Sequence, residues 1–200
     1  MTQIDVLIDL ASPNAYLAHK VLPGLALRTG ATLRHTPVLL GGLFKLTGNQ
    51  APMLAYSDIP NKLAYEGREF ERFIARHGLS YFTFNPHFPV NTLLLMRMAV
   101  AADAAGVLPA FLDAGFHHMW EAPKKMDEPE IIAAAFADTD LDVEALLAAA
   151  GTPEIKAKLM ANTKDAAARG AFGIPSFFVE GELYFGKNTL DEIERILTNR

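Results

Sequence analysis

Strand-like segments occur only near the two ends of this chain, and this distribution constrains the fold more than any other feature. Residues 4–10 are β-branched and apolar enough to predict a buried strand. Ser12-Pro13 follows, a hydroxyl suited to a helix N-cap and a proline suited to the first helical position, and the expected helix stops at Gly30. Residues 32–38 predict a second strand. The front of the chain is therefore a β-α-β unit, which in one sheet implies parallel strands.

The back of the chain predicts a hairpin and a last helix. Two apolar runs, 176–179 and 183–185, flank a glycine-containing turn, and residues 190–197 predict the helix. Between about 61 and 171 there are only helical signals, including 62–77, 92–105, 109–120, 128–137 and 143–150. We therefore expect an α/β chain with a thioredoxin-like fold (β-α-β … β-β-α) and a large inserted all-helical domain. Residues 1–60 plus 165–200 would form the thioredoxin-like domain, and 61–164 the inserted helical domain.

Composition excludes several classes of function. A net charge of −5 argues against nucleic acid as a partner, because phosphates need a concentrated basic face. Apolar stretches fall short of the ~18 residues of a membrane span, so no membrane partner is expected. The six histidines lack a ligand spacing such as His-Glu-x-x-His, which predicts no metal site. The absence of cysteine removes disulfides, thiolate metal sites and an intrinsic cysteine nucleophile, and makes the cytoplasm the default location.

Ser12 is the candidate reactive residue. It lies where the first strand meets the first helix, and free backbone N–H groups and the helix dipole favour an anion there. No neighbouring histidine or aspartate suggests a catalytic triad, but the hydroxyl can donate a hydrogen bond to a bound thiolate. The alternative is that Ser12 only caps the helix before Pro13.

A second candidate is Gly173-Ile174-Pro175, immediately before a predicted strand. Proline suits the first residue of a strand because it lacks an N–H. A cis Ile174–Pro175 bond would leave the preceding backbone able to pair with a peptide-like ligand. The alternative is a strand-starting proline in a trans turn, since only ~5% of such bonds are cis.

Several segments together resemble the 2-hydroxychromene-2-carboxylate isomerase family, which belongs with kappa-class glutathione transferases and DsbA-type oxidoreductases. The matching segments are Asp9 to Ala18, Leu39 to Asn49, Pro60 to Lys62, Phe88 to Leu93, Gly170 to Val179 and Tyr184 to Gly186. They occur in order and cover nearly the whole chain. The resemblance implies glutathione as cofactor, a small aromatic carboxylate as substrate and a homodimer.

The resemblance also implies roles for individual residues. Ser12 would activate the glutathione sulfur, and Ile174 with a cis Pro175 would hold the tripeptide backbone. The remaining matched positions are cofactor contacts at Asn49 and Lys62, and active-site lining at Asn91 and Trp120. Lys62 could instead lie on a solvated helix face, and Trp120 could belong to the core. The substrate carboxylate needs a cationic or N–H partner, for which Lys62 and Arg97 are candidates.

The chain departs from the family pattern after Phe185-Gly186. Relatives commonly carry an acidic residue there that can meet the γ-glutamyl amine, whereas this chain has Lys187-Asn188. Asn188 can accept a hydrogen bond but not a charge-assisted one, which is about twice as strong. The expected function is a glutathione-dependent isomerase of aromatic degradation. A kappa-class-like glutathione transferase and a non-catalytic thioredoxin-fold binding module are the alternatives.

Overall fold

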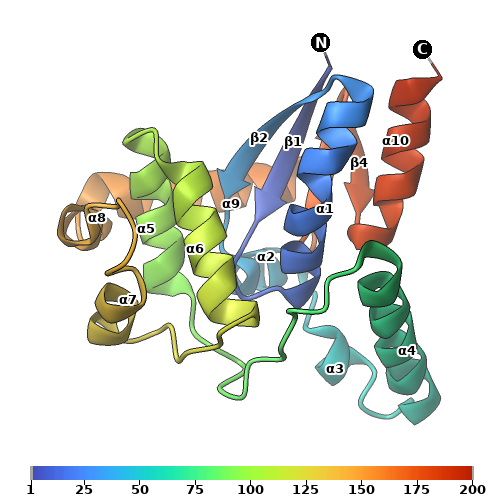
Figure 1. Ribbon diagram of the computed structural model, residues 1–200, viewed down its shortest axis with the longest axis horizontal. Coiled ribbons are helices and arrows are strands. Elements are labelled where there is room, and N and C mark those ends of the chain that lie inside the picture. The colour runs from blue at the N-terminus through green and yellow to red at the C-terminus, as the bar shows by residue number, and fades with distance from the viewer. Residues whose placement is uncertain (1, 200) are drawn as a thin grey trace.

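A four-stranded mixed sheet forms the centre of the molecule (Figure 1). The structure is a computed structural model that describes residues 2–199. The strands β1 (Gln3–Ile8), β2 (Thr32–Pro37), β3 (Ser176–Val179) and β4 (Glu182–Phe185) lie in the order β2-β1-β3-β4. β1 pairs parallel with β2 and antiparallel with β3, and β3 pairs antiparallel with β4. The predicted thioredoxin-like α/β fold is confirmed.

The helices follow the expected order, and two short ones that the sequence did not predict lie just after β2. Their bounds are α1 Pro13–Thr29, α2 Leu40–Thr47, α3 Pro52–Ala55, α4 Pro60–His77, α5 Leu93–Ala104, α6 Leu108–Trp120, α7 Pro129–Ala135, α8 Val143–Ala150, α9 Pro153–Ala168, the 3₁₀ helix η1 Lys187–Thr189 and α10 Leu190–Thr198. α1 ends as predicted at Gly30, which adopts the left-handed conformation with φ 68°.

Helices cover both faces of the sheet. α1 and α10 lie side by side on the near face in Figure 1, and Arg28 of α1 donates two hydrogen bonds to the Glu194 carboxylate of α10. α9 lies behind the sheet, where the Asn162 side chain donates to the Pro37 carbonyl at the end of β2 at 3.0 Å. This layering leaves the ends of β1 and β2 open to the remaining helices.

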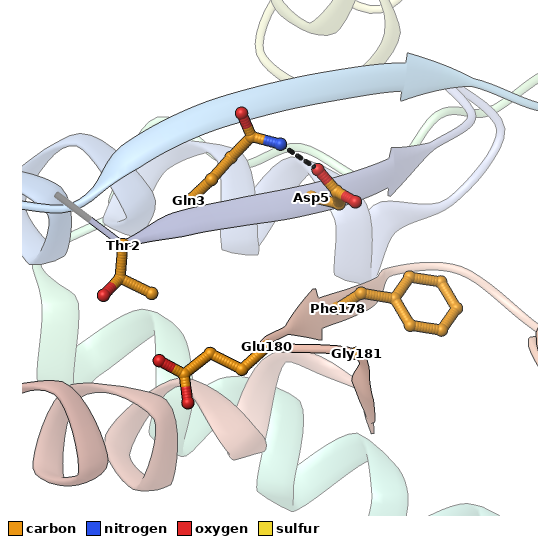
Figure 2. Close-up of a pocket in the computed structure, with 6 residues that line it drawn as sticks. All are labelled: Thr2, Gln3, Asp5, Phe178, Glu180 and Gly181. Carbon is orange, nitrogen blue, oxygen red and sulfur yellow. Dashed lines mark hydrogen bonds between the residues drawn. The ribbon is translucent and has the colours of Figure 1, made fainter.

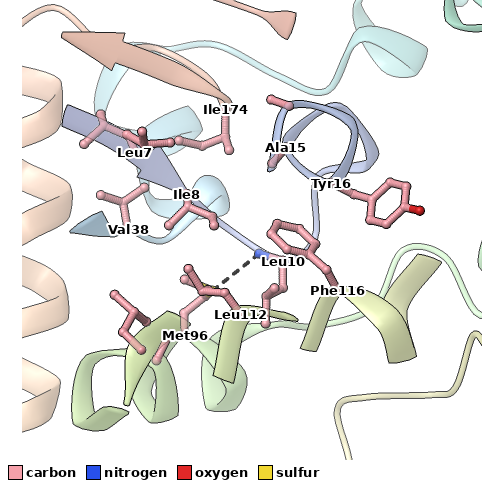
Figure 3. Close-up of a cluster of buried hydrophobic side chains, with 14 of the residues drawn as sticks. Leu7, Ile8, Leu10, Ala15, Tyr16, Val38, Met96, Leu112, Phe116 and Ile174 are labelled. Carbon is pink, nitrogen blue, oxygen red and sulfur yellow. Dashed lines mark hydrogen bonds between the residues drawn. The ribbon is translucent and has the colours of Figure 1, made fainter. Parts of the chain in front are cut away.

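The helices between β2 and α9 share one hydrophobic core with the sheet. Figure 3 shows Met96 of α5 and Leu112 and Phe116 of α6 gathered around Leu10, just after β1. Gly115 permits this approach, because a Cβ at that position would lie 2.8 Å from Leu10 Cδ1. The core therefore runs from the sheet into α5 and α6. The division into domains at residues 61 and 164 stays a prediction.

Two local features differ from the sequence-based expectations. β1 ends at Ile8 rather than at residue 10, because the chain turns there and the Ser12 N–H bonds to the Asp9 carbonyl at 3.1 Å. α2 forms despite two consecutive glycines, which disfavour helix. One of them, Gly42, lies so close to α9 that a Cβ would be 3.1 Å from Thr163 Cγ2. Within residues 2–199, no helix has both the length and the apolar character needed to cross a bilayer.

Candidate functional site

Ser12 lies at the N-terminus of α1, and its hydroxyl is already engaged on both sides. It is the N-cap, so its Oγ accepts a hydrogen bond from the Ala15 N–H at 3.1 Å. The same hydroxyl donates to the Ile174 carbonyl at 3.0 Å, across 162 residues of sequence. Only 4% of Ser12 is exposed. The cap reading of Ser12 is therefore confirmed, and the cap also joins the two segments that the sequence singled out.

The Ile174-Pro175 segment lies directly beside this cap. The Ile174–Pro175 peptide bond is cis. The Pro175 carbonyl accepts from the Gly186 N–H at 2.9 Å, which connects this segment to the residues just before η1. On the other side, Asn49 donates from its side-chain amide to the Phe172 carbonyl at 2.8 Å. Asn49 and the segment that carries Ile174 are therefore neighbours through Phe172.

A buried carboxylate supports the turn that carries Ser12. Asp9 is 1% exposed and accepts three hydrogen bonds, from the Ala11 N–H at 2.9 Å, the Leu40 N–H at 2.7 Å and the Thr92 hydroxyl at 2.7 Å. Burial raises the pKa of the Asp9 carboxyl above its usual value, although each of the three donors lowers it. These three hydrogen bonds hold the turn that carries Ser12 in place.

Lys62 and Asn188 lie on the side of the molecule formed by α4 and η1. The exposed Lys62 ammonium lies 3.3 Å from the centroid of the Tyr56 ring, a cation–π contact within the same segment of chain. Asn188 lines a cavity of about 300 Å³ whose other walls come from α4. Asn188 is two residues from Gly186, whose N–H donates to the Pro175 carbonyl. This hydrogen bond relates the cavity to Pro175.

The other predicted residues are not in direct contact with Ser12. Trp120 has no exposed surface and donates from its indole N–H to the Leu10 carbonyl at 2.9 Å, a placement that favours its core role. Asn91 is exposed and accepts from the Leu93 N–H at 3.1 Å at the start of α5. Arg97 is half-buried on α5 and makes no ion pair with any residue from 2 to 199.

A second cavity, of about 390 Å³, lies away from Ser12. It is lined by residues at the start of β1 and at the turn between β3 and β4, including Thr2, Asp5 and Glu180 (Figure 2). β1 runs from Gln3 toward Ser12, so this cavity is at the opposite end of the strand. We assign it no part in chemistry at Ser12. Among residues 2–199, no group of three histidine or acidic side chains is placed to hold a metal ion.

Two features of the site were not found from the sequence. The supporting role of Asp9 depends on partners 31 and 83 residues away, Leu40 and Thr92, and an acidic residue at the end of an apolar strand is the only local signal of it. The second feature is an ion pair between Lys187 Nζ and Glu69 Oε2 at 2.5 Å, which spans 118 residues. No sequence pattern joins those two residues.

The chemistry available at Ser12 is the stabilisation of an anion. Pro13 has no N–H and the Ala15 N–H is held by Ser12, so the attraction for an anion comes from the dipole of this 17-residue helix, which favours negative charge at that end. The Ser12 hydroxyl can supply one hydrogen bond. No base contacts it, since among residues 2–199 its hydrogen-bond partners are the Ala15 N–H and the Ile174 carbonyl. The arrangement therefore suits a ligand that brings its own nucleophile better than it suits nucleophilic attack by the serine.

Comparison with known proteins relates the chain to one protein family and to enzymes of two kinds. A model of the family described as DSBA-like thioredoxin domain matches residues 3–198. The 2-hydroxychromene-2-carboxylate isomerase of Sphingobium xenophagum is 27% identical over 194 residues, which are 97% of each chain. Glutathione S-transferase kappa 1 of Homo sapiens is 26% identical over 212 residues, covering 97% of this chain and 90% of the relative. These curated relatives are isomerases and transferases, which supports an enzyme.

Solved structures show the same fold. A structure of 2-hydroxychromene-2-carboxylate isomerase superposes with a TM-score of 0.81 at 23% identity, covering 98% of this chain and 95% of the other. A probable DsbA oxidoreductase from Streptomyces coelicolor superposes with a TM-score of 0.77 at 19% identity, covering 100% and 89%. At these identities the superpositions concern the arrangement of the backbone.

Proposed function

Because the chain belongs to the DSBA-like thioredoxin domain family, we propose that it is a glutathione-dependent isomerase. The proposed reaction interconverts 2-hydroxychromene-2-carboxylate and trans-o-hydroxybenzylidenepyruvate. The observation that carries this proposal is the position of Ser12, whose hydroxyl caps α1 and bonds the Ile174 carbonyl in a chain without cysteine. The relatives named above support the choice of reaction.

The residues present fit a peptide thiol. Ile174 offers a backbone carbonyl beside the Ser12 hydroxyl, and Asn49 offers an amide bonded to the neighbouring Phe172. Lys62, an exposed ammonium over the Tyr56 ring, is proposed as a further contact. When bound, glutathione would supply a thiolate whose reversible addition makes a conjugated C=C bond single, so that rotation becomes possible before elimination restores the bond. Ser12 and the N-terminus of α1 would hold the sulfur as its anion. Asn91 and Arg97, both near the start of α5, are the proposed contacts of the aromatic carboxylate.

The thiolate fraction of the bound thiol shows how much activation Ser12 and the N-terminus of α1 can supply. Lowering a thiol pKa from ~8.5 to ~6.5 raises the thiolate fraction at pH 7 from ~3% to ~75%. Part of this gain is lost because a weaker base is a weaker nucleophile. The activation is thus about tens-fold, and correct positioning of the electrophile has to contribute the rest.

The test begins with binding and ends with turnover. Added glutathione should raise the melting temperature, because a ligand that binds only the folded state stabilises it. Absorbance assays on the chromene carboxylate should then show glutathione-dependent isomerisation. Ser12→Ala should reduce turnover about 10²-fold or more, in the range for removing one donor to a developing anion. Its loss of stability should be about 2–4 kcal/mol, the sum of the ~1 kcal/mol typical of a helix cap and the ~1–3 kcal/mol of leaving the buried Ile174 carbonyl unpaired.

The control is Ser80→Ala, which removes an exposed serine outside the site. It should leave both melting and turnover unchanged. Unchanged turnover in Ser12→Ala would reduce Ser12 to a structural cap. If glutathione neither shifts the melting temperature nor supports a reaction, the proposed glutathione-dependent function is wrong.

A kappa-class-like transferase is the second candidate, and the 26% identity to a kappa-class enzyme favours it. A halo-aromatic substrate separates the two, because a transferase consumes glutathione and an isomerase returns it. We also propose, from the resemblance to these enzymes, that the chain acts as a homodimer in the cytoplasm, where thiols are kept reduced. Light scattering on the eluting protein tests the dimer.

A further inference from the structure

The cavity between α4 and η1 has an unusual distribution of charge. It measures about 300 Å³, and its walls are Tyr65, Glu69, Arg72, Phe73, Arg76 and Asn188. Figure 1 shows α4 next to the start of α10, which η1 precedes. The Gly186 N–H donates to the Pro175 carbonyl, and Gly186 is two residues before the wall residue Asn188, which relates the cavity to the Ile174-Pro175 segment. A molecule held at Ser12 and Ile174 could extend toward it.

The one carboxylate in the wall of this cavity is already paired. Glu69 Oε2 lies 2.5 Å from Lys187 Nζ. The Lys187 side chain is 5% exposed, and its ammonium lies 5.3 Å from the Phe73 ring centroid and 5.6 Å from that of Phe70. Ion pairing and the two aromatic faces thus hold this lysine in place. Glu69 is not available to a second cation without competition from Lys187.

The remaining charges in the wall are cationic. Arg76 pairs with Asp191 at 3.2 Å on the exposed surface. Arg72 is exposed and has no ion-pair partner among residues 2–199. The cavity and its immediate surroundings therefore carry Arg72, Arg76 and Lys187 against Glu69 and Asp191, which leaves a surplus of positive charge. A ligand carboxylate meets an unpaired guanidinium here, whereas a ligand ammonium meets three cations.

Resting on the proposed thiol-dependent function, we propose that this cavity receives an anionic end of the thiol cofactor and disfavours an ammonium beside it. Lys187 sets this preference by occupying Glu69, and Arg72 provides the binding charge. The peptide thiol preferred by this cavity then has a terminal carboxylate and no neighbouring free amine, while glutathione still binds. Glutathione itself carries both groups at its γ-glutamyl end, so it is the weaker ligand of the pair compared below.

Two thiols that differ only in this ammonium test the proposal. They are glutathione and its des-amino analogue, glutaryl-cysteinyl-glycine, titrated by calorimetry into the full chain. The unchanged protein should bind the analogue about threefold to tenfold more tightly, the size expected for one partly exposed charge interaction. Asn188→Asp adds a carboxylate to the wall at an exposed position. It should change the ratio of the two affinities in favour of glutathione by a similar factor.

Further variants distinguish an effect of charge on binding from a loss of folding. Arg72→Met should weaken binding of the analogue, and Arg68→Met should not, because Arg68 is on the same helix but outside the cavity wall. Lys187→Met frees Glu69 and should also shift the ratio toward glutathione. If it fails to fold, Asn188→Asp still decides the matter.

The possible failures are distinguishable. Equal or tighter binding of glutathione by the unchanged protein, with no shift in Asn188→Asp, overturns this inference and leaves the proposed isomerase standing. Absence of binding by both thiols overturns the proposed function and the inference with it.

Discussion

At the scale of single residues, His35 is a half-buried base whose Nε2 is buried without a hydrogen-bond partner in the described part of the chain. Its ring lies 5.9 Å from that of His19. Burial and, to a smaller extent, the nearby His19 lower the pKa of His35 to about 4, while Asp113 opposes the shift. His19 is itself bonded to Asp113 at 2.7 Å. The folded chain therefore holds His35 neutral where the unfolded chain protonates it.

We predict that His35 makes stability depend on pH between about 6.5 and 4. The contribution is complete above the unfolded pKa of 6.5 and is lost as pH falls toward the folded pKa of about 4. The loss reaches at most about 3 kcal/mol. His35→Leu should therefore gain stability relative to the unchanged protein as pH falls from 7.5 to 4.5, measured by urea unfolding at each pH. His87→Leu, at an exposed position, is the control. The prediction is contradicted if the unfolding free energy of His35→Leu depends on pH in the same way as that of the unchanged protein.

At the scale of elements, one carboxylate connects three parts of the fold. Asp9 accepts from the turn after β1, from the first residue of α2 and from Thr92, which precedes α5. α2 has no side-chain cap of its own at Leu39, so Asp9 takes the place of one. The position of Ser12 therefore depends on elements far apart in the sequence.

Asp9→Ala should destabilise the protein by about 2–4 kcal/mol. It leaves two backbone N–H groups and a hydroxyl without their acceptor, at about 1–3 kcal/mol each, and relieves the cost of burying a carboxylate. Urea unfolding measures the change, and Asp138→Ala, at an exposed loop position, should have almost no effect. Asp9→Asn retains one acceptor oxygen, so its loss of stability should lie between those of Asp9→Ala and Asp138→Ala. A loss below 1 kcal/mol in Asp9→Ala would show that water replaces the carboxylate.

The elements that the sequence predicts well are those with local signals. Two or three adjacent residues are enough to predict the cap at Ser12, the left-handed Gly30 and the turn before Glu182. All three have the expected structure. α2 was not predicted, because its glycines are explained only by α9 packing against it. The same limit applies to the site. Ser12 and Pro175 were found from their neighbours, while the pair Lys187–Glu69 needs the fold to bring it together.

At the scale of the whole molecule, the buried core is unevenly shared among the helices. α5 contributes seven buried residues, from Leu95 to Ala102, in its 12 positions. α4 contributes only Phe73 in 18 positions, and α3 contributes none. Segments with few buried apolar contacts open locally at low free energy. The wall of the α4–η1 cavity is therefore the less stable side of the molecule.

Hydrogen exchange followed by mass spectrometry should resolve this difference. Amides of α3 and α4 should exchange first, while those of β1, β3 and α5 should exchange last and together, because they share one core. Added thiol should slow exchange in α4 more than in α8, which lies outside the proposed site. Separate protection of the sheet and of α5 would instead support two independently folding domains, divided as the sequence predicted.

The Ser12 hydroxyl has a single hydrogen to give, and in this fold the Ile174 carbonyl receives it. A sulfur anion can take that hydrogen only if the carbonyl finds another donor, since leaving a buried acceptor unpaired costs about 1–3 kcal/mol. A peptide thiol brings such a donor in its own amide, and 2-mercaptoethanol brings none. Exclusion of simple thiols would then follow from the count of hydrogen bonds at one carbonyl, with no steric barrier needed.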